Sequence, residues 1–141
     1  MVAKHVMSQP FAVCQAFDTL NQAAKLMWNA DCGVIPIVDN EGRAVAMLTD
    51  RDIYRAASAQ GKRLHEIPVH TAMSKVLVAC QPRAPLQQVE KLMVEHKIRW
   101  LPVLDEDGRP VGILSFNDLE RMAHSNTLLH PAAKSEARRS A

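Results

Sequence analysis

The strongest constraint on this chain is an internal repeat. When the sequence is shifted by 66 residues, Met7-Ser8 falls on Met73-Ser74, and the match continues without a gap to Ala57 and Ala123. The duplication predicts that the two copies fold by the same plan. The identical pairs include Cys14/Cys80, Leu20/Leu86, Gln22/Gln88, Lys25/Lys91, Leu26/Leu92, Met27/Met93, Pro36/Pro102, Asp39/Asp105, Gly42/Gly108, Arg43/Arg109, Val45/Val111, Leu48/Leu114, Asp52/Asp118 and Arg55/Arg121.

Neither copy is large enough to be stable alone. The chain has 141 residues with 4% aromatics, and about 50 residues per copy bury too little apolar surface. We therefore expect the copies to pack through their sheets about a pseudo-two-fold axis, with clefts between them where ligands bind. The predicted division is a first repeat over 4–57, a connector over 58–71, a second repeat over 72–124 and a disordered basic tail over 125–141.

Each copy carries the pattern β-α-β-β-α, which predicts an α/β fold of the α+β type. Asp18 is the candidate N-cap of the first helix, and Pro85 suits the first turn of its counterpart. Two apolar runs around a glycine-containing turn predict a hairpin in each copy. The predicted strands are 11–14, 34–38 and 44–48 in the first copy and 76–80, 100–104 and 111–114 in the second, with closing helices from about Asp50 and Asn117.

Charge and composition argue against several classes of protein. The net charge is +2, and the tail alone supplies it through Lys134, Arg138 and Arg139 against Glu136. A neutral body with a short basic tail lacks the basic patch that is typical of nucleic-acid-binding proteins. In addition, no apolar run approaches the roughly 18–20 residues of a membrane span. Three cysteines without metal-type spacing favour the reducing cytoplasm.

The junction between the hairpin and the second helix has the same pattern in both copies. It reads Thr49-x-x-Asp52 in one and Ser115-x-x-Asp118 in the other. The simpler interpretation is a helix cap, in which the hydroxyl accepts from an amide and the carboxylate favours the helix dipole. The second interpretation adds a phosphorylated ligand, because helix N-termini bind phosphate and a carboxylate can hold ribose hydroxyls. The two roles are compatible.

These features together resemble a known family. The duplicated unit, the Pro36 and Pro102 strands, the Asp-x-x-Gly-Arg turns and the (Thr/Ser)-x-x-Asp junctions look like a tandem pair of CBS domains, also called a Bateman module. The resemblance covers roughly Lys4 to His124. Within it, the sequence is similar to small stand-alone bacterial CBS-pair proteins. It implies a disc with two clefts that bind adenosine-containing ligands.

The resemblance also implies roles for individual residues. Aspartates of the motif would hold the ribose, and the adenine would meet the first strand of the opposite copy. Arg99 would contact phosphate in the Asp118 cleft, where the first copy has Gly33. The residues predicted for the Asp118 cleft, including those that flank its motif, are Ala12, Val13, Arg99, Ile113, Ser115, Asn117 and Asp118. Those predicted for the Asp52 cleft are Thr49, Arg51, Asp52, Val78 and Ala79.

The predicted function is a regulatory module without chemistry of its own. Its ligand would be AMP, ADP, ATP or S-adenosylmethionine, and it would act on its own dimer mate or on a separately encoded effector protein. The alternative is a constitutive interaction scaffold with no bound nucleotide. Nothing in the sequence supplies a convincing base or nucleophile for an enzyme, and Cys14 and Cys80 are either a redox pair or small buried hydrophobes.

Overall fold

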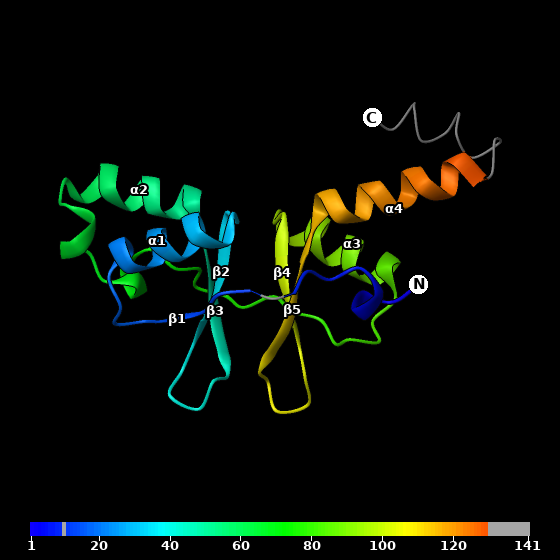
Figure 1. The fold of residues 1–141 in the computed structure, drawn as a ribbon, viewed down its shortest axis with the longest axis horizontal. Helices are drawn as coiled ribbons and strands as arrows, with labels where there is room; N and C mark the ends of the chain where they lie inside the picture. Colours follow the sequence, from blue (N-terminus) through cyan, green and yellow to red (C-terminus); the bar gives the residue numbers. More distant parts are fainter. Residues whose placement is uncertain (10, 130–141) are drawn as a thin grey trace.

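Two similar halves lie side by side, with their helices at one end and their hairpins at the other (Figure 1). The computed structural model describes residues 1–9 and 11–129. The first half holds β1 (Cys14–Gln15), α1 (Leu20–Ala30), β2 (Val34–Val38), β3 (Ala44–Thr49) and α2 (Asp50–Gln60). The second half holds α3 (Leu86–His96), β4 (Trp100–Leu104), β5 (Pro110–Ser115) and α4 (Phe116–Leu129). The predicted fold class and repeat architecture are confirmed.

The hairpins agree with their predicted bounds to within one residue. Strand β2 pairs antiparallel with β3, and β4 pairs antiparallel with β5. The first strand of each repeat is much shorter than predicted. It is reduced to β1, parallel to β2, in the first half and to a single bridge between Cys80 and Val103 in the second. Most of each predicted strand serves instead as a link that crosses between the halves.

The cap of α1 corrects a prediction. Thr19, not Asp18, is the N-cap, and its hydroxyl accepts from the Gln22 N–H while the Gln22 side chain accepts from the Thr19 N–H. This reciprocal pair is a capping box. Asp18 instead accepts from the Gln15 N–H at 2.8 Å. Pro85 is the N-cap of α3, one position before the first turn.

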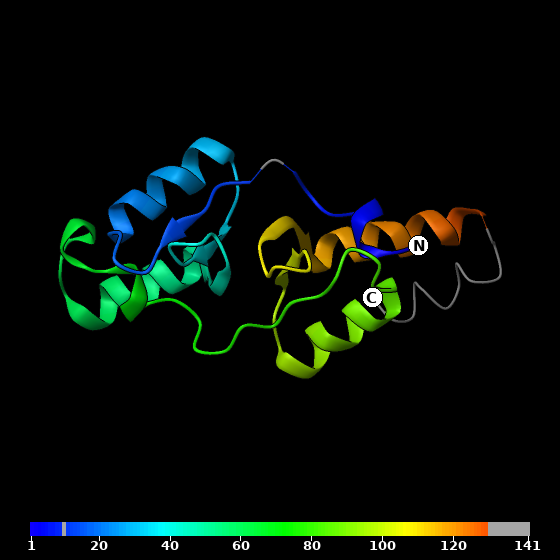
Figure 2. The same cartoon turned by 90° about the horizontal axis from the view of Figure 1, so that it is seen from below.

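The halves exchange their leading segments. Residues 1–9 pack on the second half, where Ala3 is fully buried and Ser8 exchanges two backbone hydrogen bonds with Ile113 (2.8 and 3.2 Å). Residues 64–74, which include the short 3-10 turns Leu64–Glu66 and Val69–Thr71, pack on the first half. Figures 1 and 2 show the N-terminal segment lying with α3 and α4 rather than with its own repeat. The exchange ties both cores together.

The predicted connector is therefore part of the fold. Ile67 and Val69 are fully buried in the core of the first half, together with Leu20 and Ile35. Helix α4 continues to Leu129, five residues into the segment predicted as a tail. The rest of that predicted tail, residues 130–141, lies outside the described residues.

The sheets of the two halves meet through a small apolar cluster. Val34 and Met47 of the first half pack with Ile113 of the second, and partly buried side chains, Trp100 among them, surround these three. The hairpin tips are also joined, because Ala44 N–H donates to the Gly108 carbonyl at 2.9 Å and Arg109 Nε donates to the Glu41 carbonyl at 3.0 Å. The halves thus contact each other both at this cluster and at the hairpin tips.

Candidate functional site

A cavity of about 570 Å³ lies between the two repeats. One wall comes from the N-terminal crossing segment and from the end of α1 through the start of β2. The other wall comes from β4 and from the junction of β5 with α4. The lining residues are Ser8, Phe11, Ala12, Ala30, Asp31, Cys32, Gly33, Val34, Ile35, Trp100, Ile113, Ser115, Asn117, Asp118 and Arg121.

The β5–α4 junction brings a buried carboxylate into this cavity. Asp118 N–H donates to the Ser115 hydroxyl oxygen at 3.0 Å, and Ser115 N–H donates to Asp118 Oδ2 at 3.3 Å. Ser115 and Asp118 are 6% and 8% exposed. Among residues 1–9 and 11–124, whose burial the structure describes, they are the two buried polar residues. The predicted helix cap is present here. Its geometry leaves Oδ1 of the carboxylate outside the cap.

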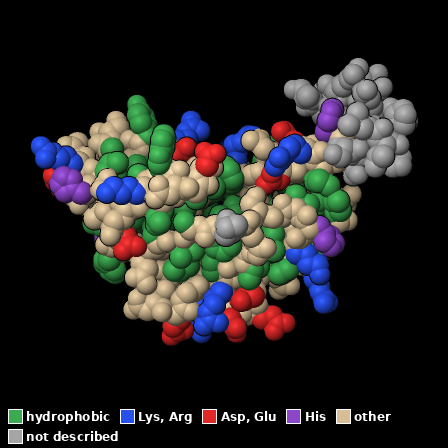
Figure 3. Space-filling view, in the orientation of Figure 1, with side chains coloured by type: hydrophobic (Ala, Val, Ile, Leu, Met, Phe, Trp, Pro, Cys, Tyr) green, Lys and Arg blue, Asp and Glu red, His purple; other side chains and the backbone are tan. Residues whose placement is uncertain are grey.

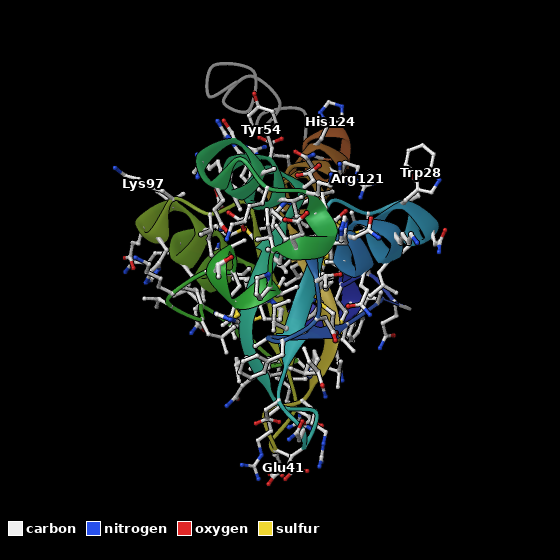
Figure 4. All side chains as sticks on the ribbon, turned by 90° about the vertical axis from the view of Figure 1, so that its left-hand side faces the viewer. Trp28, Glu41, Tyr54, Lys97, Arg121 and His124 are labelled. Atoms are coloured by element: carbon white, nitrogen blue, oxygen red, sulfur yellow. The ribbon has the colours of Figure 1, made fainter. Side chains whose placement is uncertain are left out.

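Arg121, one turn further along α4, pairs with that second oxygen. Its Nη2 forms an ion pair with Asp118 Oδ1. The arginine side chain is 76% exposed, whereas the aspartate side chain is 10% exposed. Figure 4 shows Arg121 projecting from α4 on the side where α1 and Trp28 lie. The guanidinium therefore sits where the buried carboxylate meets the cavity.

The remaining surface of the cavity is largely apolar. Val34 and Ile113 are buried at its base, and the half-buried rings of Phe11 and Trp100 line its sides. Aromatic faces of this kind can stack on a planar base. The cavity thus combines an apolar region with one buried carboxylate and one cation, which is the usual chemistry of a small-molecule site.

The structure brings together most of the residues predicted for the Asp118 cleft. Ala12, Ile113, Ser115, Asn117 and Asp118 all line the cavity. Val13 is 39% exposed and is outside the lining.

Arg99, which the resemblance places in this cleft, has its contacts with two residues next to the cavity lining or in it. Arg99 is exposed, lies 5.2 Å from the centroid of the Phe116 ring and donates to Asn117 Oδ1 at 3.1 Å. It is outside the set of described residues that line the cavity, whereas its repeat equivalent Gly33 is within that set. Gly33, which precedes β2, thus lines the cavity together with the Ser115–Asp118 motif of the other copy.

The Asp52 half shows the cap without the same gathering of residues. Thr49 and Asp52 form a capping box with both hydrogen bonds at 3.0 Å, and Arg51 is exposed. Val78 packs against the core of the second half, and Ala79 is half-buried. At two positions where the first copy lines the Asp118 cavity, the second copy carries a larger side chain. These pairs are Ala12/Val78 and Gly33/Arg99.

Several lining residues were missed by sequence reasoning. Phe11, Asp31, Cys32 and Arg121 line the cavity, but none belongs to the junction motif. The repeat held a usable signal for one of them, since Arg121 is identical to Arg55 at the equivalent position. The others could be placed only by knowing which segments of the two halves face each other.

The cysteines are three free thiols. Burial raises the pKa of Cys80 to about 11, and burial together with the Asp18 charge raises the pKa of Cys14 to about 12. Both are therefore neutral thiols at physiological pH. Cys32 is half-buried in the cavity wall, and its Sγ donates to the Val34 carbonyl at 3.3 Å. Within the described residues, no group of three or more His, Cys, Asp or Glu side chains is arranged to hold a metal ion.

Two β-α-β-β-α repeats with exchanged segments and a cavity between them define a tandem-repeat module. Comparison with known proteins identifies its family. The chain matches the CBS domain model twice, over residues 3–59 and 66–124, and it belongs to the CBS domain family. No described helix combines the length and apolar character needed to span a bilayer.

Individual relatives agree with this assignment. The CBS domain-containing protein YhcV of Bacillus subtilis strain 168 is 38% identical over 123 residues, which cover 87% of this chain and 86% of that protein. The CBS domain pair of protein MJ0100, solved in complex with 5′-methylthioadenosine and S-adenosyl-L-methionine, superposes with a TM-score of 0.80 at 26% identity. That match covers 89% of this chain and 98% of the solved pair.

Some relatives are enzymes, and this chain matches a small part of each. A homoserine O-acetyltransferase of Methanohalobium evestigatum is 26% identical over 117 residues, which is 83% of this chain but 23% of the enzyme. The chain is thus similar in extent to YhcV and to the isolated pair rather than to the enzyme.

Proposed function

We propose that this protein is a regulatory module that binds an adenosyl ligand, such as AMP, ADP, ATP or S-adenosylmethionine, in the Asp118 cavity. The observation that carries the proposal is the buried, cap-bound carboxylate of Asp118 on the wall of an inter-repeat cavity of about 570 Å³. The adenosyl ligands of the MJ0100 pair, which shares the fold, support this choice of ligand class.

The groups in the cavity suggest how such a ligand would lie. Asp118 Oδ1 is the oxygen left outside the cap, and it would accept hydrogen bonds from the ribose. The Ser115 oxygen already accepts from the Asp118 N–H, so its own proton is available to donate to the ligand. The base would lie against Phe11 and Trp100, with the polar edge contacts left to the backbone of the crossing segment.

The proposal gives the two motifs different roles. The Asp118 motif binds ligand, and the Asp52 motif chiefly caps α2. Among the described residues, the wall of the cavity between the repeats includes Asp118 and does not include Asp52. We therefore expect one occupied site per chain.

Ligand binding would act through the relation between the repeats. Because both repeats supply walls of the cavity, a ligand stabilises one arrangement by the difference in its affinity for the two states. The exposed side chains of Trp28 on α1 and Tyr54 on α2 offer a surface for a second copy or an effector protein. The module itself would carry no catalysis and would work in the cytoplasm.

Alkylation of Cys32 provides a direct test of ligand entry. Cys32 lies in the cavity wall, whereas Cys14 and Cys80 are buried. Saturating AMP or S-adenosylmethionine should slow Cys32 modification by iodoacetamide, measured by mass spectrometry of the labelled peptide. The protection should be lost in Asp118→Asn and kept in Asp52→Asn. Equal labelling with and without every ligand of the panel would contradict the proposal.

A further inference from the structure

We propose that Arg121 is the residue that recognises the anionic group on the 5′ side of the bound ligand, and that it leaves Asp118 to do so. This inference rests on the proposed function and adds a specificity-determining residue to the same site. The ligand class is an adenosyl compound that carries one anionic group near the ribose. That group is either the 5′-phosphate of a mononucleotide or the carboxylate of an adenosyl amino acid.

The charges around the cavity single out Arg121. The described lining contains one cationic side chain, Arg121, and two carboxylates, Asp31 and Asp118. Arg99, which the family resemblance favoured as the phosphate contact, is outside this lining and bound to Asn117. An anionic ligand in this cavity therefore has Arg121 as its nearest opposite charge from the lining. Guanidinium groups suit phosphate and carboxylate oxygens geometrically.

The present partner of Arg121 is the oxygen that the ribose needs. Asp118 Oδ2 is held by the Ser115 N–H, and Oδ1 meets Arg121. A ribose hydroxyl that approaches Oδ1 competes with the guanidinium for the exposed side of a carboxylate that is otherwise buried. An anionic group on the ligand offers the displaced guanidinium a new partner. A neutral nucleoside offers no such partner. Its binding is therefore weakened by the free energy needed to break the ion pair.

The arginine is free to make this exchange. Its side chain is 76% exposed, and it forms an ion pair with Asp118. Surface arginines of this kind have low barriers to rotamer change. The two carboxylates of the lining also set a limit, because a triphosphate would bring several charges to a cavity with one cation. We therefore expect one anionic group to be read, rather than a chain of phosphates.

The repeat supplies a matched control. Arg55 occupies the position equivalent to Arg121 and follows Asp52 by the same three residues. It is exposed, and among the ion pairs of the described residues none joins it to Asp52. Arg55 is also outside the cavity lining. Removing it changes the net charge as removal of Arg121 does, without touching the proposed site.

The test is a set of calorimetric titrations with adenosine, AMP and S-adenosylmethionine. The proteins are the wild type, Arg121→Ala, Arg121→Gln and Arg55→Ala, each checked for an unchanged melting temperature. In Arg121→Ala we expect AMP binding to weaken about tenfold or more, as for loss of a charge-assisted hydrogen bond. Adenosine binding should stay the same or tighten, because no ion pair has to be broken. Arg55→Ala should match the wild type for all three ligands.

The outcomes separate the two levels of the proposal. Loss for AMP alone identifies phosphate as the group read, and loss for S-adenosylmethionine alone identifies the carboxylate. Equal losses for adenosine and for the anionic ligands, or no loss for either anionic ligand, would overturn the role of Arg121 while leaving the site intact. A wild-type protein that binds none of the three would overturn the role of Arg121 as the reader of a single anionic group, and one that also fails to bind ADP and ATP would overturn the proposed function.

Discussion

At the scale of single residues, Asp118 links the fold to the proposed site. One carboxylate oxygen closes the cap of α4 and the other meets Arg121 at the cavity. The spacing from Ser115 to Asp118 was enough to predict the cap, since a capping box is a local contact. The partner of the second oxygen could not be predicted as firmly, because an exposed arginine has several partners within reach. The contacts of Arg99 with Phe116 and Asn117 could not be predicted for the same reason, because the Arg99 side chain is also exposed.

The buried thiols predict a loss of stability in alkali. The folded-state pKa values of Cys14 and Cys80 are raised to about 12 and about 11, whereas exposed thiols of the unfolded chain titrate near 8.5. Between roughly pH 8.5 and 11, only the unfolded chain therefore loses these protons. The contribution of the protonated thiols to the free energy of unfolding is complete below that range and decreases as the pH rises through it. The measurement is the free energy of unfolding in urea from pH 7 to 10.5.

Alanine variants isolate this effect from the titration of other groups. Cys14→Ala and Cys80→Ala should each show a shallower decline with pH than the wild type. Cys32→Ala is the control for the loss of a thiol that is half-buried rather than buried. A decline that is the same in all four proteins would show that the buried thiols are not responsible.

At the scale of secondary-structure elements, the hairpins and closing helices followed from the sequence and the crossing segments did not. Strands β2 and β4 are continuous apolar runs beside glycine turns, so local pattern defines them. Residues 1–9 and 64–74 are short and have no clear periodicity. Their position is decided by tertiary packing on the opposite repeat, which is why Ile67 was assigned to a connector.

The crossing segment yields a stability prediction with a built-in control. Val69 is 0% exposed in the core of the first half, whereas Val76, seven residues later, is 69% exposed. Val69→Ala should lower the free energy of unfolding by about 2 kcal/mol, from lost burial and the cavity left behind. Val76→Ala should change it by less than about 0.5 kcal/mol. Similar small changes for both variants in urea unfolding would show that residues 64–74 are not part of the core.

At the scale of the whole molecule, the two ends differ in character. The hairpin tips carry charged side chains, and hydrophobic side chains are exposed over the helices (Figure 3). Trp28 and Tyr54 project outward from α1 and α2 (Figure 4), with exposed fractions of 86% and 74%. Large exposed aromatics on one face are typical of a protein–protein contact.

We expect a homodimer through this helical face. Light scattering of the purified chain should give twice 15.7 kDa, and Trp28→Glu with Tyr54→Glu should return it to the monomer mass. Phe17→Glu is the control, because Phe17 is 86% exposed but lies beside His70 rather than on α1 or α2. A monomeric wild type, or a dimer that is unaffected by the double change, would contradict this assembly.

The central claim is that the Asp118 cavity binds an adenosyl ligand. Calorimetric titration of the purified protein, whatever its oligomeric state, tests this claim most directly. The panel is AMP, ADP, ATP, S-adenosylmethionine and NADH, added to the wild type, Asp118→Asn and Asp52→Asn. The account predicts saturable binding of at least one ligand, with one site per chain, lost in Asp118→Asn and retained in Asp52→Asn. Silence across the panel, or binding that depends on Asp52 and not on Asp118, would contradict it.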